Sequence, residues 1–192
     1  RKIEVSRVGE YLEKLHDNFV IVDPQKRREK MIAGIASIEK EIGGEAVLDD
    51  DLVEENLFLV EYPVPFFGSF DRSFLRIPEE VLITTMKNHQ RYFPVRDDAG
   101  NLKPYFIGVS NNRAANMSVV REGNERVLRA RLSDASFFWE EDQKVPLSAR
   151  VDSLKKILHH DKLGTVYEKV SQVRELCGVL SRKMGLSSEE AK

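Results

Sequence analysis

Cysteine is nearly absent from this sequence, since Cys177 is the only one among 192 residues. A single cysteine cannot form an internal disulfide, and it cannot build the cysteine clusters of structural zinc sites. Proteins without disulfides are typical of reducing compartments, so we expect a cytoplasmic protein. Cys177 itself falls in an apolar helical stripe, which favours a packed thiol over a catalytic nucleophile.

Long apolar runs and an excess of charge are also missing. No segment approaches the roughly 18 apolar residues of a membrane-spanning helix, and the first residues, RKIEVSRVGEYLEK, lack the apolar core of a signal peptide. The formal net charge of −2 excludes a uniformly basic nucleic-acid coat but is compatible with a local basic face. We therefore expect a soluble chain that does not bind membranes.

The sequence also lacks an initial methionine, because it begins at Arg1. Near the other end, Ser187 and Glu190 have the spacing of a helix N-terminal capping box, directly after Gly185 as a helix stop signal. A new helix is thus predicted to begin where the sequence stops. We interpret the chain as a fragment of a larger protein.

The motifs of common catalytic centres are absent as well. The sequence holds no G-x-S-x-G, no glycine-rich phosphate loop, no H-E-x-x-H and no dinucleotide-binding fingerprint. His159 and His160 would point about 100° apart on a helix, which favours a helix C-terminus over a metal site. The acidic run from Glu45 to Glu61 lacks the spacing of a calcium loop and is interpreted as a solvated face. We predict no catalytic residue, no metal site and no bound cofactor in this chain.

What the sequence does contain is a mixture of helix and strand patterns, followed by helices alone. Apolar spacing and Pro at first helical positions predict helices at residues 8–17, 24–44, 52–61 and 78–89. Short β-prone runs predict strands at residues 19–22, 91–96 and 104–110. The last two form an antiparallel hairpin, in which Pro94 indicates an edge strand. Further helices are predicted at residues 123–144, 146–158 and 166–185. The change to pure helix near Val145 predicts a domain boundary there.

The predicted helix from Gly123 to Lys144 has the most regular pattern. Its apolar stripe, at i, i+4, i+7 and i+11, consists of Leu128, Leu132, Ala135 and Trp139. Phe137 and Phe138 are expected to widen the buried face. The arginines of this helix lie off the stripe, with Arg131 nearest to its border. Two interpretations remain open at this point: binding of an anionic polymer, or a core helix whose arginines pair with carboxylates.

Two stretches of the chain are locally basic. Five arginines between Arg113 and Arg131 stand against two glutamates, and four basic residues between Lys87 and Lys103 stand against two acidic ones, with aromatic residues interleaved. Arginine suits phosphate because its planar fork donates two parallel hydrogen bonds, and exposed aromatic rings can stack on unpaired bases. RNA binding is therefore one hypothesis for these stretches.

Four blocks of the sequence resemble one known family. In chain order, these blocks are MKNHQRYFPV, GNLKPYFIGVSN, GNERVLRARLSDASFFWEEDQK and KLGTVYEKV. The upstream segment fits the same family, and it reads LVEENLFLVEYPVPFFGSFDRSFLRIPEEVLITTMK. They are similar to the β subunit of the bacterial tetrameric glycyl-tRNA synthetase. The similarity covers nearly the whole chain. It implies part of an α₂β₂ ligase that attaches glycine to tRNA in a reaction that depends on ATP and Mg²⁺.

The resemblance also implies a fold and a division of labour. Residues 1–145 would form an α+β domain with an antiparallel sheet, similar to the tRNA-editing-type domain of phenylalanyl-tRNA synthetase. Residues 146–192 would begin a helical domain of HD type. The α subunit would bind ATP and Mg²⁺, while the β subunit would bind and position tRNA, so the fragment itself is expected to be non-catalytic.

Three hypotheses follow for the role of this fragment. In the first, it binds tRNA and serves as a scaffold for the α subunit, and the residues predicted to contact the RNA backbone are Lys87, Arg91, Arg113, Arg121, Arg126 and Arg129. In the second, it is a hydrolytic editing domain, which requires a pocket near His89 and Asn111. In the third, the role is purely structural, and Arg126 and Arg129 are buried against carboxylates of Glu140 or Asp142. The exposure of the helix arginines distinguishes the first hypothesis from the third.

Overall fold

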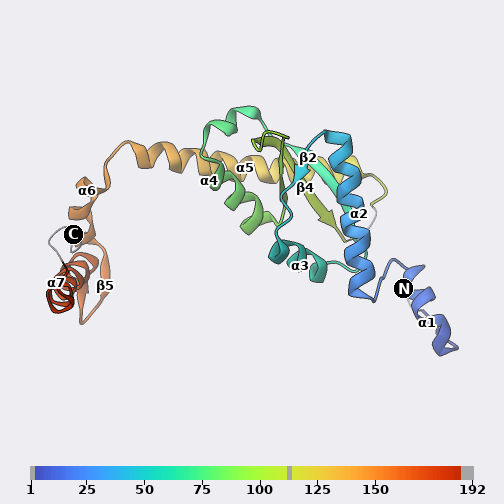
Figure 1. Cartoon of the computed structure of the whole chain (residues 1–192), viewed down its shortest axis with the longest axis horizontal. Helices are drawn as coiled ribbons and strands as arrows, with labels where there is room; N and C mark the ends of the chain where they lie inside the picture. The colour runs from blue at the N-terminus through green and yellow to red at the C-terminus, as the bar shows by residue number, and fades with distance from the viewer. Residues whose placement is uncertain (1–2, 112–113, 187–192) are drawn as a thin grey trace. The chain divides into compact units, whose positions relative to one another are not determined.

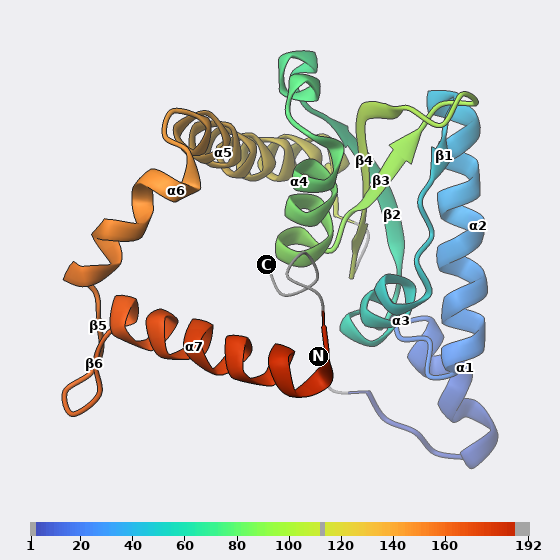
Figure 2. The same ribbon diagram turned by 60° about the vertical axis from the view of Figure 1, so that its left-hand side comes forward.

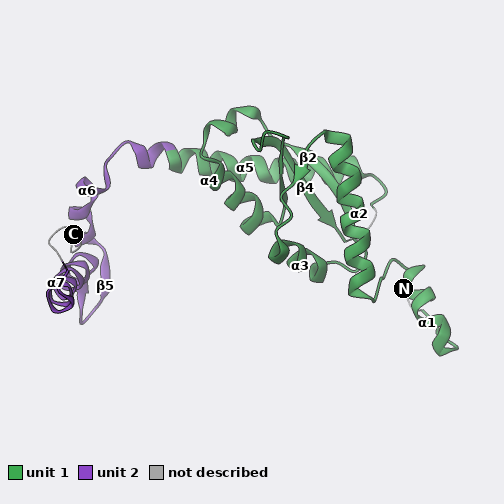
Figure 3. Cartoon of the chain, in the orientation of Figure 1, with its two compact units in different colours: residues 1–139 green, residues 140–192 purple. Residues whose placement is uncertain are grey.

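A computed structural model describes residues 3–111 and 114–186 (Figure 1). Arg113 and the pattern at Ser187 to Glu190 lie outside the described residues. The chain divides into two compact units, Arg1–Trp139 and Glu140–Lys192 (Figure 3). No helix in the described part of the chain is both long enough and apolar enough to cross a membrane.

Unit 1 is built on a four-stranded antiparallel sheet. Its strands are β1 (Glu45–Ala46), β2 (Val64–Ser69), β3 (Phe93–Arg96) and β4 (Leu102–Ser110). They lie in the order β1-β3-β4-β2, with β4 paired to β2 along six residues. Helices cover both faces of this sheet (Figure 2). The predicted α+β class with an antiparallel sheet is therefore confirmed.

The predicted hairpin is formed by β3 and β4. In the turn between them, the carboxylate of Asp97 accepts hydrogen bonds from the backbone N–H groups of Ala99 and Asn101. The edge position predicted from Pro94 is wrong, because β3 lies between β1 and β4. Proline has no backbone N–H to donate, but on the side of β1 it serves as an acceptor: the Pro94 carbonyl accepts a hydrogen bond from the N–H of Val47 at 2.8 Å.

One face of the sheet is covered by α2 (Pro24–Ile42) and α3 (Asp50–Leu59). Asp23 caps α2 ahead of Pro24, and Gly43 ends it in the left-handed region at φ 60°, as the sequence predicts. The core on this face consists of buried residues from α2, α3, β3 and β4, with the largest contributions from Met31, Ile35, Val53, Phe93 and Ile107.

The other face is covered by four helical segments. They are η2 (Arg72–Arg76), α4 (Glu79–Thr84), its π-helical continuation η3 (Thr85–His89), and α5 (Met117–Gln143). The core on this face is formed mainly by Leu82, Met86, Tyr92, Phe106, Leu128 and Leu132. Consecutive residues of β4 serve the two cores, since Phe106 points to this face and Ile107 to the opposite one.

Helix α5 is longer than predicted and rotated relative to the expectation. It begins at Met117, ahead of Gly123, and its buried residues are Leu128, Leu132 and Ser136. Phe137 and Phe138 are 56% and 63% exposed, so the prediction that they widen the buried face is wrong. The reason is geometric: each lies about 100° or more from Ser136 around the helix, beyond the reach of the packed neighbours.

Two further expectations in unit 1 have different outcomes. The helix predicted at residues 8–17 is present as η1 (Val8–Glu10) and α1 (Tyr11–His16). The strand predicted at 19–22 is wrong. Phe19 has φ 62°, and the one ladder-like bond of this segment runs from the N–H of Ile21 to the carbonyl of Glu61 at 2.9 Å. A single bond does not make a strand.

Unit 2 contains α6 (Leu147–Arg150), η4 (Val151–Lys156), β5 (Leu158–His160), β6 (Gly164–Thr165) and α7 (Val166–Met184). The single helix predicted at 146–158 is wrong, and so is the helix C-terminus predicted at His159 and His160, because both residues lie in the β5–β6 hairpin. The predicted α7 is confirmed, with a capping box between Thr165 and Glu168. Cys177 is exposed on α7, so the expected packed thiol is wrong.

The contrast between Leu132 and Phe137 provides a test of the α5 orientation. We expect Leu132→Ala to lower the free energy of unfolding by about 2–5 kcal/mol, because the side chain is fully buried. Phe137→Ala should change it by no more than about 0.5 kcal/mol, because the ring is more than half exposed. Urea unfolding of both variants measures the difference. A loss of several kcal/mol for Phe137→Ala would contradict this orientation of the helix.

Candidate nucleic-acid interface

Lys87 and Arg91, two of the predicted RNA contacts, lie between α4 and β3: Lys87 is part of η3, and Arg91 follows η3. The helix continues through a π-helical turn at η3, and Arg91 follows in the left-handed region at φ 55°. The N–H of Arg91 donates to the carbonyl of Lys87 at 3.0 Å. Left-handed backbone is uncommon for a residue with a side chain, so other contacts must hold it.

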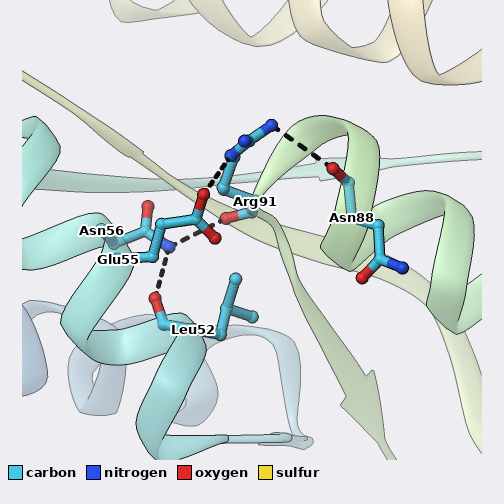
Figure 4. Close-up of polar contacts among 5 residues, drawn as sticks. All are labelled: Leu52, Glu55, Asn56, Asn88 and Arg91. Carbon is cyan, nitrogen blue, oxygen red and sulfur yellow. Dashed lines mark hydrogen bonds and ion pairs between the residues drawn. The ribbon is translucent and has the colours of Figure 1, made fainter.

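Both side chains form ion pairs with carboxylates of α3 and its N-cap. The Lys87 ammonium lies 2.9 Å from Oδ2 of Asp49. Nε of Arg91 lies 2.7 Å from Oε1 of Glu55, and Figure 4 shows this second pair. The hydrogen bond from Lys87, together with one from the N–H of Leu52, lowers the pKa of Asp49. The acidic run at 45–61 is therefore not only a solvated face, because two of its carboxylates bind the predicted RNA contacts.

Asn56 holds Arg91 in place and is a residue that the sequence reasoning missed. Its side chain is 4% exposed, and its Nδ2 donates to the carbonyls of Leu52 at 2.9 Å and Arg91 at 3.1 Å (Figure 4). A buried amide that bridges a helix carbonyl and the carbonyl of Arg91 fixes the backbone of Arg91 in its left-handed conformation. The only sequence signal was a polar residue at a buried position of α3.

A polar cleft of about 230 Å³ lies beside these ion pairs. Its lining residues are Asp49, Asp51, Leu52, Glu55, Lys87 and Asn88. Its polar lining consists of carboxylates, one ammonium and one amide, without a hydroxyl, thiol or imidazole. Within the described part of the chain, no three His, Cys, Asp or Glu side chains come close enough together to hold a metal ion.

The two residues named for the editing hypothesis do not line this cleft. His89 is exposed at the end of η3. The amide oxygen of Asn111 accepts a hydrogen bond from the N–H of Glu61 at 2.6 Å and a longer one from Tyr62 at 3.4 Å. Asn111 thus connects the end of β4 to the segment before β2, which is a structural role.

The arginines of α5 lie on different sides of the helix. Arg121 is half-buried, with its guanidinium 5.4 Å from the ring centre of Phe67, while Arg126, Arg129 and Arg131 are exposed. At about 100° per residue, Arg126 and Arg129 are about 60° apart, and Arg131 points about 140° or more away from both. The hypothesis that Arg126 and Arg129 are buried against carboxylates is therefore wrong. Arg131 forms no ion pair with another described residue, so its expected internal pairing is not found either.

The segment from Ser69 to Arg76 runs along the side of α5 that carries Arg129. The N–H of Ser69 donates to Oε1 of Glu125 at 2.8 Å, and Nη2 of Arg76 donates to Oγ of Ser136 at 3.4 Å. Hydrogen bonds from Ser73 lower the pKa of Asp71, and the positive charge of Arg129 adds to the effect. Asp71 therefore lies near Arg129, between these two contacts.

The two neighbouring elements η2 and α5 together carry four exposed arginines. We refer to them as the η2–α5 basic surface, and its members are Arg72, Arg76, Arg126 and Arg129. Asp71, the N-cap of η2, is an acidic side chain beside this surface. The sequence reasoning found the two arginines on α5 and missed the two on η2. The two arginines in DRSFLR were the available signal, but nothing in the sequence placed η2 beside α5.

The hydrogen bonds of Asn56 lead to a stability prediction. Asn56→Leu keeps the side-chain volume but removes both hydrogen bonds of the buried amide, so we expect a loss of about 1–3 kcal/mol in the free energy of unfolding. Glu54→Gln is the matched control, because Glu54 is an exposed residue of the same helix, and it should change the value by no more than about 0.5 kcal/mol. Equal effects of the two substitutions in urea unfolding would show that the Asn56 bridge does not matter.

The Asp49–Lys87 pair predicts a dependence of stability on pH. Because the pKa of Asp49 is lower in the folded chain than its value of about 3.9 in an unfolded one, the pair stabilises the fold above about pH 4. This contribution disappears as the pH falls through the folded-state pKa. Asp49→Asn retains the helix cap but removes the charge, so its deficit in unfolding free energy should be largest near pH 7 and shrink below pH 4. Asp98→Asn, in an exposed turn, serves as the control; a deficit for Asp49→Asn that stays constant down to pH 2 would refute the pairing.

Similarity to known proteins identifies the family of this chain. The family model described as glycyl-tRNA synthetase beta subunit matches residues 1–192. The beta subunit of glycine–tRNA ligase from Syntrophotalea carbinolica is 51% identical over 180 residues, which is 94% of this chain and 26% of that protein. The same subunit from Desulforudis audaxviator is 46% identical over 189 residues, covering 98% of this chain and 28% of that protein. The chain thus spans about a quarter of the length of the curated relatives that it matches. The resemblance seen in the sequence is confirmed, and the chain belongs to the family of glycyl-tRNA synthetase β subunits.

Proposed function

We propose that the η2–α5 basic surface binds phosphates of tRNA, and that this chain is the tRNA-positioning part of a glycine–tRNA ligase β subunit. The observation that carries the proposal is the exposure of Arg126 and Arg129 on one flank of α5, next to Arg72 and Arg76 of η2. Guanidinium groups that are fixed on rigid elements and open to solvent suit bidentate binding of phosphate oxygens. Such contacts position an RNA without reading its sequence.

Arg121, Lys87 and Arg91 are proposed as secondary contacts. The Arg121 guanidinium is half-buried over Phe67, which leaves one of its edges for a phosphate. Lys87 and Arg91 already donate to carboxylates, and a phosphate would have to share these cations with Asp49 and Glu55. Sharing weakens the attraction, because the paired carboxylate repels the incoming anion. Arg113, also predicted, lies outside the described residues.

The remaining roles belong to the larger enzyme and are part of the same proposal. We place ATP, Mg²⁺ and the aminoacylation chemistry on the α subunit of an α₂β₂ assembly in the cytoplasm, with this chain contributing to tRNA binding and to the scaffold. For the fold, we propose that residues 1–145 are similar to the editing-type domain of phenylalanyl-tRNA synthetase and that residues 146–192 begin an HD-like domain. The antiparallel sheet of unit 1 and the helix α7 of unit 2 are compatible with both assignments.

Charge-removing variants of α5 test the proposal. We expect Arg126→Gln/Arg129→Gln to weaken binding of a tRNA(Gly) transcript and to reduce the slope of log K against log salt by about 2, one for each lost phosphate contact. Arg131→Gln is the matched control, since Arg131 is equally exposed on the same helix but points away from η2. Both the affinity and the slope can be measured by fluorescence anisotropy at several KCl concentrations between about 50 and 300 mM. Salt screens phosphate contacts progressively over this range.

Two results would contradict the proposal. The first is an absence of binding by the unmodified chain at the lowest salt concentration. The second is an equal loss of affinity in Arg131→Gln and in the double variant, which would mean that RNA responds to the total charge of α5 and not to the η2–α5 basic surface. Circular dichroism of each variant checks that the helix content is unchanged.

A further inference from the structure

Helix α7 carries an apolar stripe with the spacing of a coiled-coil seam. The stripe residues follow one another at alternating intervals of four and three, and they are Val166, Val170, Val173, Cys177, Leu180 and Met184. This is the a/d pattern of two helices that pack side by side along their length. Leu176, which is 62% exposed, lies at a flanking position and widens the stripe on one side.

Beyond the half-buried Val166, the seam residues of α7 are exposed. No residue of α7 is buried, and Val173, Leu180 and Met184 are 49%, 56% and 72% exposed. The neighbour of α7 inside unit 2 lies on another side: the Lys155 ammonium of η4 is 4.8 Å from the ring centre of Tyr167, which points about 100° away from Val166. The contacts within unit 2 therefore leave the seam free.

The charges of α7 are sorted around this seam. Lys169, Arg174 and Lys183 lie at the positions that flank a coiled-coil seam, about 60–100° from its centre, and all three are exposed. Glu168 and Glu175 lie about 160–180° away, on the opposite side of the helix. The border of the apolar stripe is thus cationic, and the negative charge of the helix is kept away from it.

We propose that this face of α7 binds an amphipathic α-helix that has an apolar seam of its own and acidic residues at the flanking positions. The flanking charges select this partner, because carboxylates there would face Lys169, Arg174 and Lys183. A second copy of α7 does not fit. In a parallel or an antiparallel pair, the cationic borders of the two copies would meet, and like charges at these positions repel. The face lies in unit 2, and this proposal does not depend on RNA binding by unit 1.

The alkylation rate of Cys177 can report whether a helix covers the seam, because Cys177 is the only cysteine of the chain and is exposed. The experiment uses the whole chain and two synthetic helical peptides of equal length, with leucine and isoleucine at the seam positions. One peptide carries glutamate at the flanking positions and the other carries lysine. We expect the acidic peptide to slow alkylation of Cys177 by about tenfold or more at saturation, because a packed helix covers the thiol. The basic peptide should bind about tenfold more weakly at low salt.

Two variants separate the apolar from the charged contribution. Leu180→Ser should weaken binding of the acidic peptide without unfolding the chain, because Leu180 is 56% exposed. Lys169→Glu/Arg174→Glu/Lys183→Glu should reverse the preference, so that the lysine peptide protects Cys177 better than the glutamate peptide.

Each alternative outcome overturns the proposal in a different way. Equal protection by both peptides would show that apolar contact alone governs the face and that the cationic borders select nothing. No protection by either peptide would show that α7 does not bind a helix. Protection of Cys177 that rises with the concentration of the chain alone, together with dimerisation in sedimentation experiments, would identify a second copy as the occupant.

Discussion

Two reciprocal aromatic–glycine pairs across β2 and β4 are the contacts on which unit 1 depends. Phe66 lies opposite Gly108, and Gly68 lies opposite Phe106. Each ring covers the glycine of the other strand so closely that a side chain has no room there: a methyl group on Gly108 would lie 2.7 Å from Cζ of Phe66. The absence of a side chain at these two positions leaves room for both rings on the face that packs against α5, where they meet edge to face with their centroids 6.4 Å apart.

The position of Phe106 determines where α5 lies, and α5 in turn presents its arginines. The ring of Phe106 stacks on that of Tyr92 with centroids 4.4 Å apart, and the Tyr92 hydroxyl donates to the amide oxygen of Asn124 on α5. Burial of this phenol raises the pKa of Tyr92 to about 12, so the hydroxyl remains a donor at any physiological pH. With Asn124 held on one side and Glu125 bound to Ser69 on the other, α5 cannot rotate about its axis. The flank with Arg126 and Arg129 therefore stays open to solvent.

The sequence predicted the structure correctly where neighbouring residues along the chain determine it, as at helix caps and turns. Asp23, Pro24 and Gly43 define both ends of α2, and the turn after β3 follows from Asp97 and its neighbours. The sequence did not predict the burial of a residue correctly where contacts with segments distant in the chain determine it. Phe137 is apolar and was expected to be buried, yet it lies on a flank of α5 that faces away from the core and is more than half exposed.

The candidate site illustrates the same limit. The charges of Lys87 and Arg91 are evident from the sequence, but their pairing with Asp49 and Glu55 depends on how α3 packs beside η3, some 36 to 38 residues apart in the chain. Arg72 and Arg76 were missed for the same reason, because their value as part of a basic surface arises only from the course of η2 along α5. Composition reveals which residues can bind an anion, and packing decides which of them are available.

The helices α5 and α7 show how one sequence pattern can serve two kinds of interaction. Both carry an apolar stripe bordered by cations. In α5 the stripe is covered by the sheet and η2, with Leu128 and Leu132 fully buried, and the flank that carries the arginines is exposed. In α7 the stripe itself is exposed, with Val173 and Leu180 about half accessible, so apolar contact and charge are offered together. An RNA phosphate suits the first arrangement, since it needs charge and no apolar surface. A partner helix suits the second, because burial of the stripe supplies the free energy and the cationic borders select the partner.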